Sequence, residues 1–204
     1  MLKPFSQACE NNAPSILTQL SRLLTNSKSV LEIGSGTGQH AVYFGKALPH
    51  LEWQASDLLE NHEGICLWLG EAGLQNVLPP IEFDVGQKYE DAERYDAIYM
   101  SNTLHIFSWK QVKRCFSKVR DTMSDKGLLL VYGPFNYNGN FTSESNMRFD
   151  QWLKAANSER GIRDFERVNK LAQDNGFIFE EDNAMPANNR LLVWRFNLNS
   201  AVES

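Results

Sequence analysis

Three glycines, Gly34, Gly36 and Gly38, alternate directly after the apolar run Val30–Ile33. A helix-compatible segment follows at once, so the pattern predicts a strand, a tight turn and a helix N-terminus. Glycine lets the backbone of such a turn approach a ligand closely, and the helix start presents free amides to it. Asp57 lies about twenty residues further on, after a second strand-like run, where a ribose-binding carboxylate is expected. Together these features predict a site for a nucleoside-containing cofactor.

The spacing of the glycines distinguishes three kinds of nucleotide site. A dinucleotide site has the pattern G-x-G-x-x-G, which the chain does not match, and a P-loop requires a lysine that is missing here. The pattern Glu32-x-Gly34-x-Gly36-x-Gly38 instead resembles the first motif of the class I S-adenosylmethionine-dependent methyltransferases. The sulfonium of that cofactor is positive and carries no phosphate. A turn without Lys or Arg, flanked by carboxylates, therefore suits it.

This resemblance extends over about residues 28–135 and implies S-adenosylmethionine as cofactor and S-adenosylhomocysteine as product. In that superfamily an acidic residue after the second strand holds the ribose, and one after the third strand contacts the adenine amine. The implied cofactor-binding residues are Glu32, Gly34, Ser35, Gly36, Gly38, Asp57, Leu58, Asp84, Val85 and Ser101. Alternatives stay open, because Glu32 could orient the turn from behind and Asp84 could cap a turn before Gly86.

The segment Ser101–His105 follows the fourth predicted strand, where ligands gather in open α/β sheets. In the superfamily the transferred methyl group meets its acceptor here, so the resemblance implies catalytic roles for Asn102 and His105. His105 is the one histidine placed for general base chemistry, although a hydrogen-bonded structural histidine fits the sequence equally well. The other histidines show no metal-ligand spacing, so no catalytic metal is expected.

The whole chain also resembles a smaller methyltransferase-like family, a domain of unknown function with no assigned substrate. The matching pieces are Ala8-Cys9-Glu10, Asn12, Ile16-Leu17, Asn146-x-Arg148-Phe149-Asp150 and Gly161-Ile162-Arg163-Asp164. The chain departs from the pattern at Asn11, where the family has a basic residue, and at Pro14, which lies slightly early. If the basic residue of the family contacts the cofactor or acceptor, another residue of this chain must replace that contact.

A long segment rich in Asn, Ser, Gly and Phe, residues 133–163, interrupts the alternation of strands and helices. We expect this insertion and an N-terminal arm, residues 1–27, to roof the acceptor pocket of a single domain spanning residues 1–204. The predicted acceptor-binding residues are Asn12, Phe135, Tyr137, Arg148 and Arg163. The arginines could clamp a carboxylate or phosphate, or pair with acids of the chain. The aromatic residues could line the pocket or anchor the loop to the sheet.

The elements that position these residues alternate along the chain. Strands are predicted at Val30–Ile33, Trp53–Ser56, Ile81–Phe83, Tyr95–Met100, Leu128–Tyr132, Phe177–Glu180 and Leu191–Phe196. Helices are predicted from near Pro14 and between most strands, including Phe149–Ala156 and one that a capping box at Ser108 and Gln111 begins. This order predicts a doubly wound α/β fold with a seven-stranded, mostly parallel sheet, an antiparallel last strand and a Rossmann-like methyltransferase topology.

Composition limits the possible partners and compartments. The chain has 204 residues and a formal net charge of -5, which argues against a general nucleic-acid surface. Its three cysteines form no C-x-x-C pair, so reduced thiols and a cytoplasmic location are expected. The sequence shows neither a signal peptide nor the run of about 18 apolar residues that a membrane span needs. It predicts no particular oligomeric state.

Two functions from different classes remain open. The first is a methyltransferase that acts on a small molecule. The second is a catalytically silent module that binds S-adenosylmethionine or its product and acts through a protein partner. A nicotinamide-dependent oxidoreductase would need the other glycine spacing and a hydride-site pair that the chain lacks. The motif Asn-Pro-Pro-Tyr, which marks amino-methylating enzymes of the superfamily, is absent.

Overall fold

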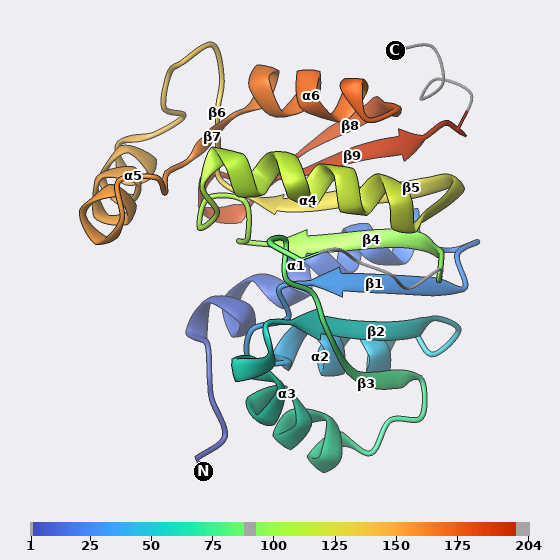
Figure 1. Ribbon diagram of the computed structural model, residues 1–204. Coiled ribbons are helices and arrows are strands. Elements are labelled where there is room, and N and C mark those ends of the chain that lie inside the picture. Colours follow the sequence, from blue (N-terminus) through green and yellow to red (C-terminus); the bar gives the residue numbers. More distant parts are fainter. Residues whose placement is uncertain (1, 88–92, 199–204) are drawn as a thin grey trace.

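A computed structural model describes residues 2–87 and 93–198 of the chain. Its centre is a seven-stranded sheet with the order β3-β2-β1-β4-β5-β9-β8 (Figure 1). These strands are β1 Ser29–Ile33, β2 Glu52–Asp57, β3 Val77–Glu82, β4 Tyr95–Ser101, β5 Met123–Gly133, β8 Phe177–Met185 and β9 Asn189–Phe196. Neighbours from β3 to β5 are parallel, whereas β9 is antiparallel to both β5 and β8. The predicted fold, with its antiparallel last strand, is confirmed.

Helices cover both faces of the sheet, with α4 and α6 on one side and α1 and α2 on the other (Figure 1). The helices are α1 Gln7–Leu23, α2 Gln39–Ala47, α3 Leu59–Ala72, α4 Trp109–Thr122, α5 Glu144–Ala156 and α6 Phe165–Asp174. Strand β5 shows why both faces are filled. Leu129 and Val131 pack in the cluster under α4 and α6, whereas Leu128 and Leu130 pack in the cluster under α1 and α2. An unbroken apolar run therefore suits a strand buried on both sides.

The N-terminal helix begins well before the position that the sequence predicts. Helix α1 begins at Gln7, and Ser6 caps it by accepting a hydrogen bond from the backbone amide of Cys9 at 3.4 Å. Pro14, which was expected near the helix start, lies inside the helix. A proline there removes one intrahelical hydrogen bond. Pro14 and Glu10 are exposed, so water can satisfy the carbonyl that loses its partner.

Two other boundaries differ from prediction for identifiable reasons. Strand β3 begins at Val77 and contains Pro79 and Pro80, which is tolerated because β3 is an edge strand. Helix α5 begins at Glu144 rather than five residues later, because Ser143 caps it. The capping box predicted for α4 is present.

The insertion between β5 and α6 contains α5 and a small second sheet. In that sheet β6 (Phe135–Asn136) pairs in parallel with β7 (Arg163–Asp164). A one-turn helix, η1 (Pro186–Asn188), connects β8 to β9. Among residues 2–87 and 93–198, no helix combines the length and apolar character that crossing a bilayer requires.

Candidate active site

The turn between β1 and α2 depends on its three glycines. Gly34, Gly36 and Gly38 have φ angles of +76°, +57° and +86°, a region that other residues rarely adopt. The amides of Gly34 and Ser35 both donate to the carbonyl of Ser56 at 3.0 Å, which fixes the turn to β2. The alternating glycines therefore provide the left-handed conformation at each position that needs it.

Asp57 ends β2 and holds the turn from the other side. Its Oδ2 accepts a hydrogen bond from the amide of Gly36 at 2.7 Å. Its Oδ1 accepts from the amide of Leu58 at 2.7 Å and from the side-chain amide of Asn61 at 2.8 Å. A carboxylate offers about four lone pairs, so these three donors leave capacity for a further donor.

Glu32 lies behind the turn, on β1. Its Oε2 accepts hydrogen bonds from the indole of Trp53 at 3.0 Å and from the hydroxyl of Ser35 at 3.1 Å. Burial raises the pKa of Glu32 to about 7. These contacts give Glu32 the orienting function that was one of its two predicted roles, although it also lines the cleft described next.

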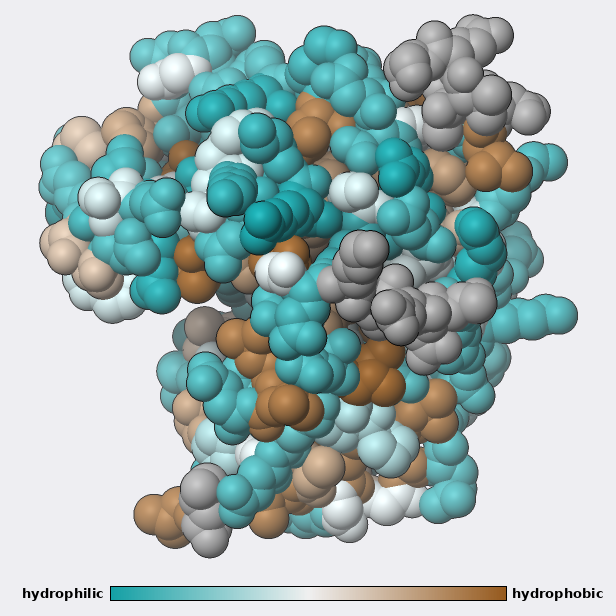
Figure 2. Space-filling view, in the orientation of Figure 1, coloured by the Kyte–Doolittle hydropathy of each residue, from teal (hydrophilic) through white to brown (hydrophobic). Residues whose placement is uncertain are grey.

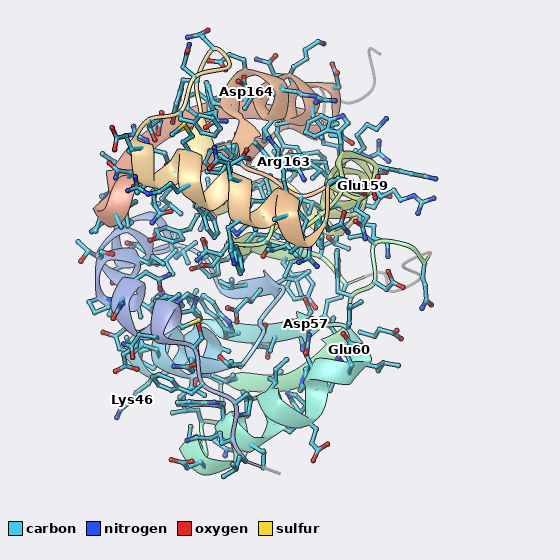
Figure 3. All side chains as sticks on the ribbon, turned by 90° about the vertical axis from the view of Figure 1, so that its left-hand side faces the viewer. Lys46, Asp57, Glu60, Glu159, Arg163 and Asp164 are labelled. Atoms are coloured by element: carbon cyan, nitrogen blue, oxygen red, sulfur yellow. The ribbon has the colours of Figure 1, made fainter. Side chains whose placement is uncertain are left out.

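The turn opens on a cleft of about 850 Å³ at the carboxyl ends of the parallel strands. Figure 3 looks onto this edge, with Asp57 and Glu60 on its lower half, and Figure 2 shows the surface hollowed below the lobe that contains α5. The sheet order changes direction between β1 and β4, which is where ligands bind in such folds. The predicted site residues that line the cleft are Glu32, Gly34, Ser35, Gly36, Asp57, Leu58, Asp84, Val85, Ser101 and Asn102.

The sequence of the chain matches one family model. The model described as "Protein of unknown function (DUF938)" matches residues 3–196. The chain belongs to the DUF938 family.

The fold of this DUF938 chain is similar to that of solved structures described as methyltransferases. A putative O-methyltransferase from Nostoc punctiforme matches with a TM-score of 0.80 at 16% identity, covering 92% of this chain and 56% of that one. An O-methyltransferase family protein from Burkholderia thailandensis gives 0.77 at 14% identity, with 91% and 56% covered. Human N-acetylserotonin methyltransferase in complex with S-adenosylmethionine gives 0.75 at 16%, with 94% and 53% covered. The chain spans just over half the length of each, and the likeness shows a methyltransferase fold.

Residues after two further strand ends complete the wall of the cleft. Asp84 follows β3, and its Oδ1 accepts a hydrogen bond from the amide of Gly86 at 2.7 Å. It therefore caps a turn, as one alternative foresaw, and lines the cleft as well. Asn102 follows β4 with a φ of +54°, while its amide donates to the carbonyl of Tyr132 at 2.9 Å. Asparagine tolerates this conformation better than most residues, and such conformations cluster at functional sites.

Two predicted residues lie outside the lining of the cleft for reasons of packing. A Cβ at Gly38 would stand 3.1 Å from Cα of Ile65, so this glycine permits α2 and α3 to approach closely. His105 is buried, with its ring against Phe149 at a centroid distance of 5.2 Å. Burial, with a smaller contribution from the charge of Arg163, lowers the pKa of His105 to about 4. This placement favours the structural interpretation of His105.

The predicted arginines also lie outside the cleft lining. Arg148 is exposed on α5 and pairs with Glu144 at 3.5 Å. Arg163 donates to the carbonyls of Leu104 and Glu159, at 3.0 Å each, and to that of Phe107. It therefore ties the insertion to the loop after β4.

The other predicted acceptor residues anchor the segments that carry them. Oδ1 of Asn12 lies 2.7 Å from Nε2 of His40. Phe135 is buried in the core. The hydroxyl of Tyr137 donates to Asp182 at 2.7 Å, and its ring stacks on Phe165 at 5.4 Å. For the two aromatic residues these contacts correspond to the anchoring alternative rather than to a pocket wall.

Several cleft residues were not predicted from the sequence. They come from the N-terminal arm, the loop after β4, α4 and the insertion, and include Leu2, Pro4, Ser6, Ala8, Cys9, Thr103, Ile106, Phe107, Gln111 and Arg160. The arm was expected to cover the pocket as a region, and Ser6, Ala8 and Cys9 agree with that. The sequence shows that the insertion, residues 133–163, contains lysine and arginine residues, but it does not single out Arg160.

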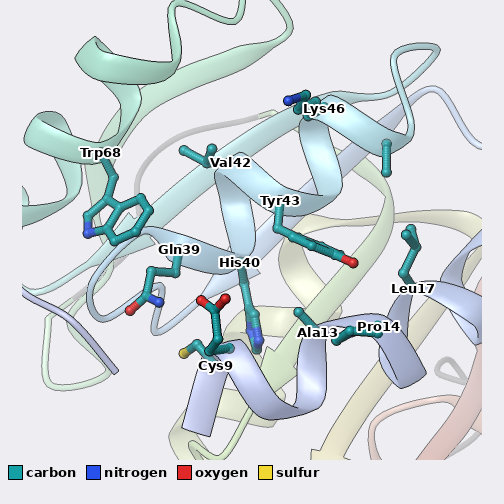
Figure 4. Close-up of a pocket in the computed structure, with 12 residues that line it drawn as sticks. Cys9, Ala13, Pro14, Leu17, Gln39, His40, Val42, Tyr43, Lys46 and Trp68 are labelled. Atoms are coloured by element: carbon teal, nitrogen blue, oxygen red, sulfur yellow. The ribbon is translucent and has the colours of Figure 1, made fainter. Parts of the chain in front are cut away.

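A second cavity, of about 790 Å³, lies between α1 and α2, with Trp68 of α3 at its side (Figure 4). It shares Cys9 and His40 with the cleft, and apolar side chains such as Leu17 and Val42 form much of its wall. Neither the glycine turn nor the carboxyl ends of the strands reach it. The cleft is therefore the candidate active site.

Proposed function

We propose that the chain is an S-adenosylmethionine-dependent methyltransferase that transfers a methyl group to a small-molecule acceptor. The observation that carries this proposal is the left-handed glycine turn held by Asp57 at the wall of one cleft. At Gly36 nothing lies within 4 Å of the position that a Cβ would occupy, so a ligand can contact the backbone there. The fold of solved methyltransferases, one of them in complex with S-adenosylmethionine, supports the same assignment.

In this proposal the cofactor lies across the ends of β1 to β4. Asp57 accepts a ribose hydroxyl with the lone pair that its three protein donors leave unused. Asp84 and Val85 flank the adenine, and Ser101 and Asn102 face the methionine half. The acidic residues Asp57, Glu60 and Asp84 give this side of the cleft a negative potential, which favours a sulfonium over a pyrophosphate.

The bound cofactor supplies an electrophilic methyl carbon on a positively charged sulfur. An acceptor lone pair forms the new bond to that carbon, while the electrons of the carbon–sulfur bond remain with sulfur. The contribution of the chain is to position the acceptor and to exclude water. Since His105 does not line the cleft, we assign it no proton transfer and propose Asn102 as the residue beside the reacting groups.

We further propose that the chain is one domain whose arm, residues 1–27, and insertion, residues 133–163, roof the acceptor side. Leu2, Pro4, Ser6 and Cys9 of the arm line the cleft, which supports the first half of this assignment. The insertion contributes Arg160.

Calorimetry with S-adenosylhomocysteine tests cofactor binding. We expect Asp57→Ala to weaken binding about tenfold or more, because the charge-assisted hydrogen bond to the ribose is lost. Asp96→Ala is the matched control. Asp96 also accepts from a backbone amide, that of Lys28 at 2.7 Å, but it lies at the amino end of β4, away from the cleft. It should lose stability and retain affinity.

Turnover is tested with methyl-labelled S-adenosylmethionine and the small-molecule fraction of a cell extract. We expect the wild type to transfer the labelled methyl group to a molecule of the extract. Asp57→Ala should lose this transfer. Binding without transfer to any fraction would instead favour a silent binding module. Equal S-adenosylhomocysteine affinity in the wild type and Asp57→Ala, or binding of a nicotinamide dinucleotide in its place, would refute the cofactor assignment.

A further inference from the structure

One basic side chain stands among the acidic groups of the cleft. Of the described residues that line it, Glu32, Asp57, Glu60 and Asp84 are acidic, whereas Arg160 is the only lysine or arginine. Glu32 lies near the end of β1, Asp57 ends β2 and Asp84 follows β3, while Glu60 lies in the first turn of α3. Arg160 comes from the insertion, and its neighbours Glu159 and Arg163 lie on the opposite half of the edge from Asp57 and Glu60 (Figure 3). The cleft is therefore electrostatically divided.

The guanidinium of Arg160 has no partner in the described part of the chain. Its Nε is buried without a hydrogen bond, and no described carboxylate forms an ion pair with it. Other arginines are paired with acids, namely Arg22, Arg120, Arg148, Arg190 and Arg195. A guanidinium is always charged, so one that lines a cleft without an anionic partner from the chain is a site that an external anion would stabilise.

The backbone that carries Arg160 is held by the three residues that follow it. The amide of Gly161 donates to the carbonyl of His105 at 3.0 Å, and that of Ile162 donates to Oδ1 of Asp150 at 2.8 Å. Arg163 fastens the same segment to the carbonyls after β4. Because this backbone is already fixed, ligand binding at Arg160 would need to order only its side chain.

We propose that Arg160 binds an anionic group, a carboxylate or phosphate, on the methyl acceptor. This inference rests on the proposed methyl transfer and adds the chemical class of the substrate to it. A guanidinium recognises both anions through two parallel N–H donors. The cofactor has a carboxylate too, but Arg160 belongs to the insertion and lines the cleft together with Ile106 and Phe107, past the end of β4. The acceptor is therefore the assigned source of the anion.

The experiment compares the wild type with Arg160→Gln, Arg160→Lys and Arg120→Gln. Arg120 pairs with Asp121 at the far end of α4 and matches the loss of one charge. An extract is separated on an anion exchanger, and each fraction is incubated with enzyme and methyl-labelled cofactor. We expect label in the retained, anionic fraction. Its rate at limiting acceptor should fall about 10- to 100-fold in Arg160→Gln, less in Arg160→Lys, and stay unchanged in Arg120→Gln.

Two binding measurements separate this inference from the proposed function. S-Adenosylhomocysteine should bind all four proteins equally, and weaker binding to Arg160→Gln would assign the arginine to the cofactor and overturn the inference. Inorganic phosphate, at fixed ionic strength, should raise the melting temperature of the loaded wild type but not of loaded Arg160→Gln. If no fraction takes up label, methyl transfer fails, and the phosphate titration alone decides the anion site. Label confined to the unretained fraction, or an Arg160→Gln rate equal to the wild type, would overturn the proposal.

Discussion

Replacing Gly36 by alanine should separate stability from cofactor binding. Gly36 has a φ of +57°, and an added Cβ would meet nothing within 4 Å, so the methyl group would enter open space. Gly36 lines the cleft, and that space is where the proposed cofactor contacts the turn. Gly73, the C-cap of α3, has a φ of +61° and equally open surroundings, but it does not line the cleft. Gly73→Ala is thus a control with the same backbone strain.

The two effects have different sizes. A non-glycine residue in the left-handed region costs about 1–2 kcal/mol, so both variants should lose that amount of stability. For a chain of this length each kcal/mol lowers the melting temperature by about 2–4 °C. An extra methyl group in a filled site costs about a further 1–3 kcal/mol. Gly36→Ala should therefore bind S-adenosylhomocysteine about 5- to 150-fold more weakly, whereas Gly73→Ala binds it normally.

Calorimetry and thermal unfolding on the three proteins decide the outcome. We expect equal losses of melting temperature in the two variants and unequal affinities for S-adenosylhomocysteine. Gly36→Ala with wild-type affinity would show that the cofactor does not contact the turn. An equal loss of affinity in Gly73→Ala would show that general destabilisation, rather than contact, weakens binding.

Three further predictions concern stability. Gly38→Ala should lower the melting temperature more than Gly36→Ala, because its Cβ would press on backbone atoms of Ile65 that cannot move aside. Glu32 titrates near pH 7 when folded and near 4.5 when unfolded, so the folded state retains a proton over that range and its stability falls as pH rises through it. In urea unfolding at pH 5 and 8, the wild type should lose up to about 3 kcal/mol more over this interval than Glu32→Gln, because both proteins share the contributions of the histidines. For His105 the sign is opposite, since its folded pKa of about 4 lies below the unfolded value of 6.5, and stability should fall as pH decreases from 6.5 to 4. His105→Gln should flatten that slope in the same assay, and an unchanged slope would contradict the burial of a neutral ring.

The glycine turn and its contact with Asp57 could be predicted from short windows of sequence, because a tight turn constrains neighbouring residues. A backbone that turns left-handed at alternate positions requires Gly34, Gly36 and Gly38 wherever the rest of the chain lies. The distance to Asp57 is likewise set by one helix and one strand. The positions of the prolines within secondary structure were harder to predict. Pro14 lies within a helix and Pro79 within a strand, and both are tolerated because of exposure or an edge position, which no local window reveals.

The other half of the cleft depends on contacts between distant segments, and this explains why the sequence did not single out Arg160. The sequence shows cations in the insertion but not which of them faces solvent, carbonyls or the cleft. Arg163 is taken up by carbonyls of the loop after β4, while Asp150 holds the amide of Ile162. Those same contacts fix the neighbouring Arg160 at the cleft. The family pieces around Asp150 and Arg163 therefore build a scaffold, and the residue proposed to touch the acceptor lies just outside them.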